Sequence, residues 1–174
     1  MNKLHGIKKM DKTMRKAFYQ ATGINLPMKL DSDFYYIPEK EKVRYSIIMS
    51  TRADYNFQKF LKTYFHLSIQ SDIELFCISV LHEFGHFITY DNIAEDDFIL
   101  SKKEQEKIEQ ALIENPDDDV IYSRYFLLPL EIMATMWAVE FITTHGNEFK
   151  TLTIKVQKNL NKFFKKNLDK EFIS

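Results

Sequence analysis

Apolar residues recur along most of the chain at the three- and four-residue spacing of amphipathic helices. This spacing predicts helices over residues 11–22, 71–90, 101–114 and 130–144, one that begins at Thr51, and a last one from Asn147. Strict alternation of apolar and polar residues is confined to short segments, and we expect strands over Phe34–Ile37 and Val43–Met49. The chain is therefore predicted to be mainly helical with a small sheet.

Capping residues set the expected helix ends. Three capping boxes, each a Ser or Thr followed three residues later by an acid, indicate helix starts: Thr51–Asp54, Ser71–Glu74 and Ser101–Glu104. Gly23 and Gly146 are expected to end the helices before them, because glycine readily adopts the left-handed conformation of a C-cap.

The composition narrows the class of protein. A chain of 174 residues with 45% hydrophobic and 28% charged residues suits one globular domain, residues 1–174, with a real core. The net charge of −1 gives no global basic field that would favour nucleic acid or an anionic membrane. The chain has one cysteine, shows no secretory signal at its start and has no apolar run long enough to span a membrane, so we expect a cytoplasmic protein.

The chemistry concentrates in the segment Leu81–His86, LHEFGH. On a helix, residues four apart differ by about 40° of rotation, so His82 and His86 project from one face and can reach a single zinc ion. Glu83 lies about 100° round from His82, where it can act as a base rather than a ligand. Two histidines placed by accident on a packed helix are the alternative. Gly85 is unusual inside a helix and suggests a close approach of another segment or of a substrate.

A catalytic zinc needs a third protein ligand. The extended pattern HExxHxxGxxH fails, because Thr89 and Asn92 stand where its Gly and third His belong. The remaining candidates are later glutamates: Glu95, Glu104, Glu106, Glu109, Glu114, Glu131 and Glu140. Glu131 stands out, because its neighbours are apolar and a buried carboxylate must be paired, neutral or metal-bound. A salt bridge to Arg124 or to a lysine is the alternative role for it.

These two segments resemble a known family. HEFGH together with the residues Glu131, Ala134, Thr135, Trp137 and Ala138, spaced E-x-x-A-T-x-W-A, is similar to the motifs of the ImmA/IrrE zinc metallopeptidases, which are Glu-ligand zincins. The resemblance covers roughly residues 43–145. Thr135 and Trp137 stand where the family usually has Asn and Phe, and forty-four residues separate His86 from Glu131.

The resemblance implies an α+β, zincin-like fold, mainly helical with a small sheet beside the HExxH helix. It implies His82, His86 and Glu131 as zinc ligands and Glu83 as the base. It also implies an edge strand that holds an extended substrate, for which Val43–Met49 is the candidate.

Other residues carry weaker signals. Thr135 and Asp91 are candidates to hydrogen-bond a ligating histidine, although a small packing residue and a loop carboxylate are the simpler interpretations. Four residues are candidates to donate a hydrogen bond to the oxyanion of peptide hydrolysis, each with a structural alternative: Tyr90, Tyr122, Arg124 and His145.

The last helix, residues 147–170, is strongly basic. It carries seven lysines: Lys150, Lys155, Lys158, Lys162, Lys165, Lys166 and Lys170. Such a helix can bind an acidic partner, a membrane surface or nucleic acid, but a solvated face is the commoner case.

Together these features predict a zinc-dependent metallopeptidase that hydrolyses a peptide bond in a specific protein substrate, with a regulatory role. The alternative is a non-catalytic zinc-binding or protein-interaction module of mobile-element origin.

Overall fold

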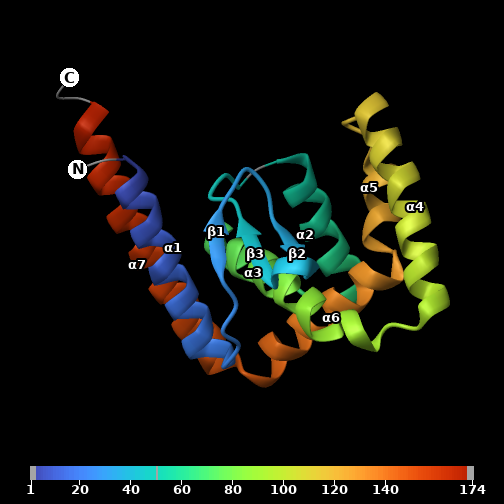
Figure 1. Cartoon of the computed structure of the whole chain (residues 1–174), viewed down its shortest axis with the longest axis horizontal. Helices are drawn as coiled ribbons and strands as arrows, with labels where there is room; N and C mark the ends of the chain where they lie inside the picture. Colours follow the sequence, from blue (N-terminus) through green and yellow to red (C-terminus); the bar gives the residue numbers. More distant parts are fainter. Residues whose placement is uncertain (1–2, 50, 172–174) are drawn as a thin grey trace. The chain divides into compact units, whose positions relative to one another are not determined.

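The computed structural model describes the backbone of residues 3–49 and 51–171, and the side chains of residues 6–49 and 51–166. Its main elements are listed in chain order: α1 (Lys3–Thr22), β1 (Met28–Leu30), β2 (Tyr35–Ile37), β3 (Lys42–Tyr45), α2 (Arg52–Phe65), α3 (Asp72–Thr89), α4 (Glu95–Glu114), α5 (Asp119–Phe126), α6 (Pro129–Thr144) and α7 (Gly146–Glu171). The short 3₁₀ turns Pro38–Lys40 and Tyr90–Asn92 complete them. The chain is mostly helical with a small mixed sheet, which confirms the α+β prediction (Figure 1).

The structure divides into two compact units. The first contains the residues up to Ile47 and those from Ile142 onward, and the second contains Ile48–Phe141. In the first unit, α1 packs along α7 and against β1. The α1–α7 core contains Met14, Phe18 and Val156, all fully buried. Asp11 ties α1 to the sheet, because its Oδ1 accepts hydrogen bonds from the Tyr45 hydroxyl at 2.8 Å and from the Leu30 amide at 2.9 Å.

The sheet corrects one expectation. The strand order is β1-β3-β2, with β1 parallel and β2 antiparallel to β3. The strand expected at Val43–Met49 is β3, which spans only Lys42–Tyr45. It lies at the centre of the sheet rather than at its edge. It cannot be the edge strand that the resemblance implied, because both of its sides are already hydrogen-bonded to neighbours.

The second unit is built round α3. Its buried side chains cover most of the helix circumference, from Leu75 to Gly85. Phe57 and Phe60 of α2 stack against Phe126 of α5 with ring centroids 5.2 and 5.4 Å apart. A helix that is apolar nearly all round belongs in the centre of a core, and this is where α3 lies.

Two of the three expected helix starts are confirmed, although only Thr51–Asp54 forms a complete capping box, because the Glu74 carboxylate accepts from the Gln70 amide at 2.7 Å. Ser71 accepts from the Glu74 amide at the start of α3, and Thr51 and Asp54 bond reciprocally at the start of α2. The third box is wrong. Ser101 lies inside α4, which begins at Glu95, because the acids Glu95–Asp97 form a favourable first turn near the positive end of the helix dipole.

Two further observations concern the ends of helices. Gly23 ends α1 with a φ of 74°, as expected, whereas Gly146 begins α7 and has no positive φ. A helix not expected from the sequence, α5, begins after Asp118, whose side chain accepts from the Val120 amide at 2.8 Å.

None of the helices described in residues 3–49 and 51–171 is, by itself, long and apolar enough to cross a membrane. The bent pair α5–α6 reaches that length and composition only as two helices joined at a 74° angle.

Candidate metal centre

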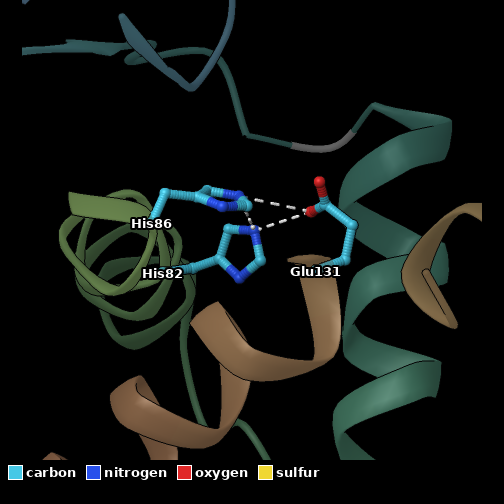
Figure 2. Close-up of side chains that lie close together, drawn as sticks. All are labelled: His82, His86 and Glu131. Atoms are coloured by element: carbon cyan, nitrogen blue, oxygen red, sulfur yellow. Dashed lines mark hydrogen bonds and ion pairs between the residues drawn. The ribbon is translucent and has the colours of Figure 1, made fainter. Parts of the chain in front are cut away.

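Helices α3 and α6 bring three ligand atoms together in the second unit. His82 Nε2 lies 3.0 Å from Glu131 Oε2, His86 Nε2 lies 3.4 Å from the same oxygen, and the two Nε2 atoms are 3.1 Å apart (Figure 2). His82 and Glu131 are 6% and 5% exposed, so the site is largely closed to solvent. The three residues form a buried group that could hold a metal ion.

The spacing of these atoms fits a metal ion. Ligand atoms bonded at about 2.0–2.1 Å to one tetrahedral zinc lie about 3.3 Å apart. The observed separations of 3.0, 3.1 and 3.4 Å bracket that value. In addition, two imidazole Nε2 atoms facing each other at 3.1 Å need a proton or a cation between them to avoid lone-pair repulsion.

Thr135 fixes the tautomer of His82. Its hydroxyl donates to the Glu131 carbonyl oxygen at 2.8 Å, so it must accept from His82 Nδ1, which lies 3.0 Å away. His82 therefore carries a proton on Nδ1 and turns Nε2 toward the group. This is the outer hydrogen bond that orients most metal-ligating histidines. The structure thus places Thr135 in contact with a candidate ligand.

Gly85 allows the two helices to approach. A Cβ atom at this position would lie 2.8 Å from the carbonyl carbon and the Cα of Ala134 on α6, and closer still to the Ala134 oxygen. No real side chain is accommodated at such distances. The close approach of another segment, expected from a glycine inside this helix, is confirmed.

Charges within the group reinforce one another. Burial alone would lower the pKa of His86, but the charge and hydrogen bond of Glu131 outweigh it and raise that pKa to about 9. Burial alone would raise the pKa of Glu131, but His86 and His82 hold it well below its usual range. Without a metal, the site is therefore held together by the attraction between a protonated His86 and a negatively charged Glu131.

Glu83 is buried beside this group and is 6% exposed. Its charge acts on two neighbours, since it contributes to the raised pKa of His86 and to that of Tyr125. Phe57 of α2 lies edge-on to the His82 ring, with centroids 5.4 Å apart, and forms an apolar wall there.

Tyr125 was not expected from the sequence. Burial raises its pKa well above the usual value, and the negative charges of Glu131 and Glu83 raise it further. Its neighbours Tyr122 and Arg124 were among the candidate donors, and nothing in the sequence chose among the candidates. The helix α5, which the sequence did not predict, brings Tyr125 close enough to Glu131 and Glu83 for their charges to act on its hydroxyl.

Other predicted residues lie elsewhere. Arg124 is 3.6 Å from Glu104 of α4, so the alternative salt bridge to Glu131 is not formed. Asp91 is exposed in the turn after α3, and Tyr90 packs on Phe98 with centroids 5.5 Å apart. His145 is exposed in the first unit, with Nδ1 2.7 Å from the Thr144 hydroxyl.

Two further residues named in the sequence analysis are Tyr122, a candidate oxyanion donor, and Glu140, a candidate third ligand. Tyr122 lies on α5 and is half-buried. Glu140, nine residues beyond Glu131 on α6, is exposed, as a residue on the opposite face of the helix should be.

No protein-family model, curated protein or solved structure matches this chain. The resemblance to the ImmA/IrrE peptidases therefore rests on its two motifs.

Proposed function

We propose that this chain is a zinc-dependent metallopeptidase. The observation that carries the proposal is the convergence of His82, His86 and Glu131 at metal-ligand spacing, with a fourth residue, Glu83, buried beside them without belonging to the group. A purely structural zinc site usually closes its fourth position with Cys or His and has no use for a base. A carboxylate held next to a three-ligand site supports hydrolysis instead.

Each residue has a role in the proposed reaction. His82, His86 and Glu131 would hold zinc, and Thr135 would keep the His82 Nε2 lone pair directed at it. Zinc, when bound, supplies the Lewis acidity that makes water a nucleophile near neutral pH. Glu83 would take a proton from the attacking water and deliver it to the amide nitrogen as the C–N bond breaks.

Tyr125 is the donor we assign to the carbonyl oxygen of the substrate. Its raised pKa keeps the hydroxyl protonated at physiological pH, so it can donate a hydrogen bond to the oxyanion that forms when water attacks. The charges of Glu131 and Glu83 act on the same hydroxyl, so Tyr125 lies close to the proposed ligands and the proposed base.

The substrate class follows from the resemblance rather than from the site. We propose one specific protein substrate and a regulatory role, as the similarity to the ImmA/IrrE motifs implies. The compartment we propose is the cytoplasm, because the single cysteine, Cys77, is a free buried thiol on α3.

The test is to replace Glu83 with Gln, which keeps the shape and removes the base. Glu83→Gln should keep its metal and its melting temperature while cleavage falls about 10²–10⁴-fold. The readout is the set of protein N-termini in cells that carry wild type, Glu83→Gln or the exposed control Glu140→Gln. If no N-terminus depends on Glu83, the chain is not a peptidase, and the non-catalytic zinc-binding module replaces this proposal.

A further inference from the structure

The net charge of −1 conceals a division between the two units. The first unit, up to Ile47 and from Ile142, contains seventeen Lys and Arg against eight Asp and Glu, whereas the second contains seven against seventeen. Their formal charges are therefore +9 and −10. Charges so divided along a chain suggest that the basic part meets a polyanion.

On α1 the cations share one face. Lys8, Lys12 and Arg15 are spaced to form a row, and Lys9 and Lys16 flank it; all five are exposed. The opposite face is the buried one, with Met10, Met14 and Phe18.

On α7 most of the cations lie away from the buried stripe of the helix. Lys158, Lys162 and Lys165 repeat at helical spacing on the face opposite Leu152, Val156 and Leu160, and all three are exposed. Lys155 Nζ donates to Gln20 Oε1 at 3.0 Å, so this lysine lies at the border between α7 and α1.

The two helices run side by side in opposite directions (Figure 1). Asn159 Nδ2 lies 3.5 Å from the Thr13 carbonyl oxygen, which fixes their register. One turn beyond Thr13 on α1, Lys16 is level with the region of Lys155 and Lys158 on α7. One turn before Thr13, Lys9 is level with the region of Lys162 and Lys166. The cations of the two paired helices are together called the basic surface: Lys8, Lys9, Lys12, Arg15, Lys16, Lys150, Lys155, Lys158, Lys162, Lys165 and Lys166.

Few carboxylates balance this surface. Residues 6–22 and 146–166 contain only Asp11 and Glu148 as acids, and Asp11 is occupied by Tyr45 and Leu30 of the sheet. Among the described side chains, no ion pair involves a cation of the basic surface. Neighbouring like charges repel, so a ligand that neutralises them would bind favourably.

We propose that the basic surface binds nucleic acid through its phosphate backbone, without reading bases. An amphipathic helix that enters a membrane needs a free apolar face, but the apolar stripes of α1 and α7 are buried, and the exposed Ile154 and Phe164 lie ten residues apart on α7. A protein partner is less suitable, because lysine is depleted at protein interfaces. The exposed amides Gln157 and Asn161 add groups that can hydrogen-bond phosphate or sugar.

The dimensions suit a nucleic-acid strand. From Lys150 to Lys166, α7 rises about 24 Å, which equals about seven base pairs of duplex DNA. This inference does not depend on the proposed metal chemistry, since it uses only residues of the first unit.

The test compares two triple variants of the full chain. One removes three lysines of the basic surface: Lys16→Gln, Lys158→Gln and Lys162→Gln. The control removes three exposed lysines of the second unit and gives the same net charge: Lys59→Gln, Lys62→Gln and Lys103→Gln. Binding is measured by fluorescence anisotropy with a 20-base-pair duplex DNA and a 20-nucleotide single-stranded RNA, over a series of salt concentrations.

Wild type and control should bind at least one of the two probes with affinity that falls steeply as salt rises. If all three lysines reach phosphates, the first variant should lose about 2.7 units of the DNA salt slope and up to roughly 500-fold in affinity at 0.1 M salt. Equal losses in the two variants, or no binding of either probe by wild type at 50 mM salt, would overturn the proposal. Binding to phosphatidylserine vesicles but to neither nucleic acid would assign the surface to membranes instead.

Discussion

Replacing Gly85 with Ala tests the geometry of the metal centre without touching a ligand. The added Cβ would lie 2.8 Å from two backbone atoms of Ala134, whereas ordinary contacts begin near 3.4 Å. The helices α3 and α6 must therefore part by roughly half an ångström or more. Overpacking of this kind costs about 1–3 kcal/mol, and the better helix propensity of Ala returns about 1 kcal/mol. We expect a net loss of about 0–2 kcal/mol in stability.

The metal site should respond more sharply than the stability. His82 and His86 lie on α3 and Glu131 on α6, so parting the helices lengthens both nitrogen–oxygen separations, now 3.0 and 3.4 Å. We expect zinc affinity, measured by competition with a chelating dye, to fall at least tenfold, since displaced outer contacts already cost about 10–100-fold.

The matched control for this substitution is Gly146→Ala, where a Cβ meets nothing within 4 Å. It should not lower the free energy of unfolding, and it should leave the zinc affinity unchanged. Unchanged zinc affinity in Gly85→Ala would refute the argument that this glycine sets the distance between the ligands.

Three further predictions concern the same centre. Thr135→Val should weaken zinc binding about 10–100-fold, because His82 Nδ1 loses its acceptor, while Thr135→Ser should keep it. Zinc affinity should fall up to about tenfold for each pH unit below about 9, because His86 then holds a proton that the metal must displace; a flat titration between pH 6 and 8 would contradict this. Tyr125→Phe should keep zinc and KM but lower kcat against the substrate that depends on Glu83, and an unchanged kcat would remove Tyr125 from the mechanism.

Local patterns allowed much of the second unit to be predicted. The start of α3 at Ser71 and the extent of α6 followed from capping and from Pro129, because these depend on neighbours in the sequence. The spacing of His82 and His86 likewise gave their shared face. Seven later glutamates could have paired with these histidines. Glu131 was preferred because its neighbours in the sequence are apolar.

What the sequence could not give depends on distant partners. Ser101 resembled an N-cap but is fully buried inside α4, with its hydroxyl 3.4 Å from the Leu130 amide of α6. A hydroxyl that bonds another helix has no local signature. The central place of β3 depends on pairing with β1, a three-residue strand too short to show a period.

The charge division was missed for a different reason. A net charge of −1 averages a basic and an acidic unit, and the boundaries of these units are set by contacts between residues as distant as Asp11 and Tyr45. The basic character of α7 was visible, but its alignment with the cations of α1 required the fold.

The most direct test of the central claim is the metal content of the purified protein. Elemental analysis should find about one zinc per chain in wild type and in the exposed control Glu140→Gln. His82→Ala and His86→Ala should lose the metal, and Glu131→Gln should bind it far more weakly, because each removes one of the three converging ligand atoms. Full zinc occupancy in both histidine variants, or loss of zinc in Glu140→Gln but not in Glu131→Gln, would contradict the assignment.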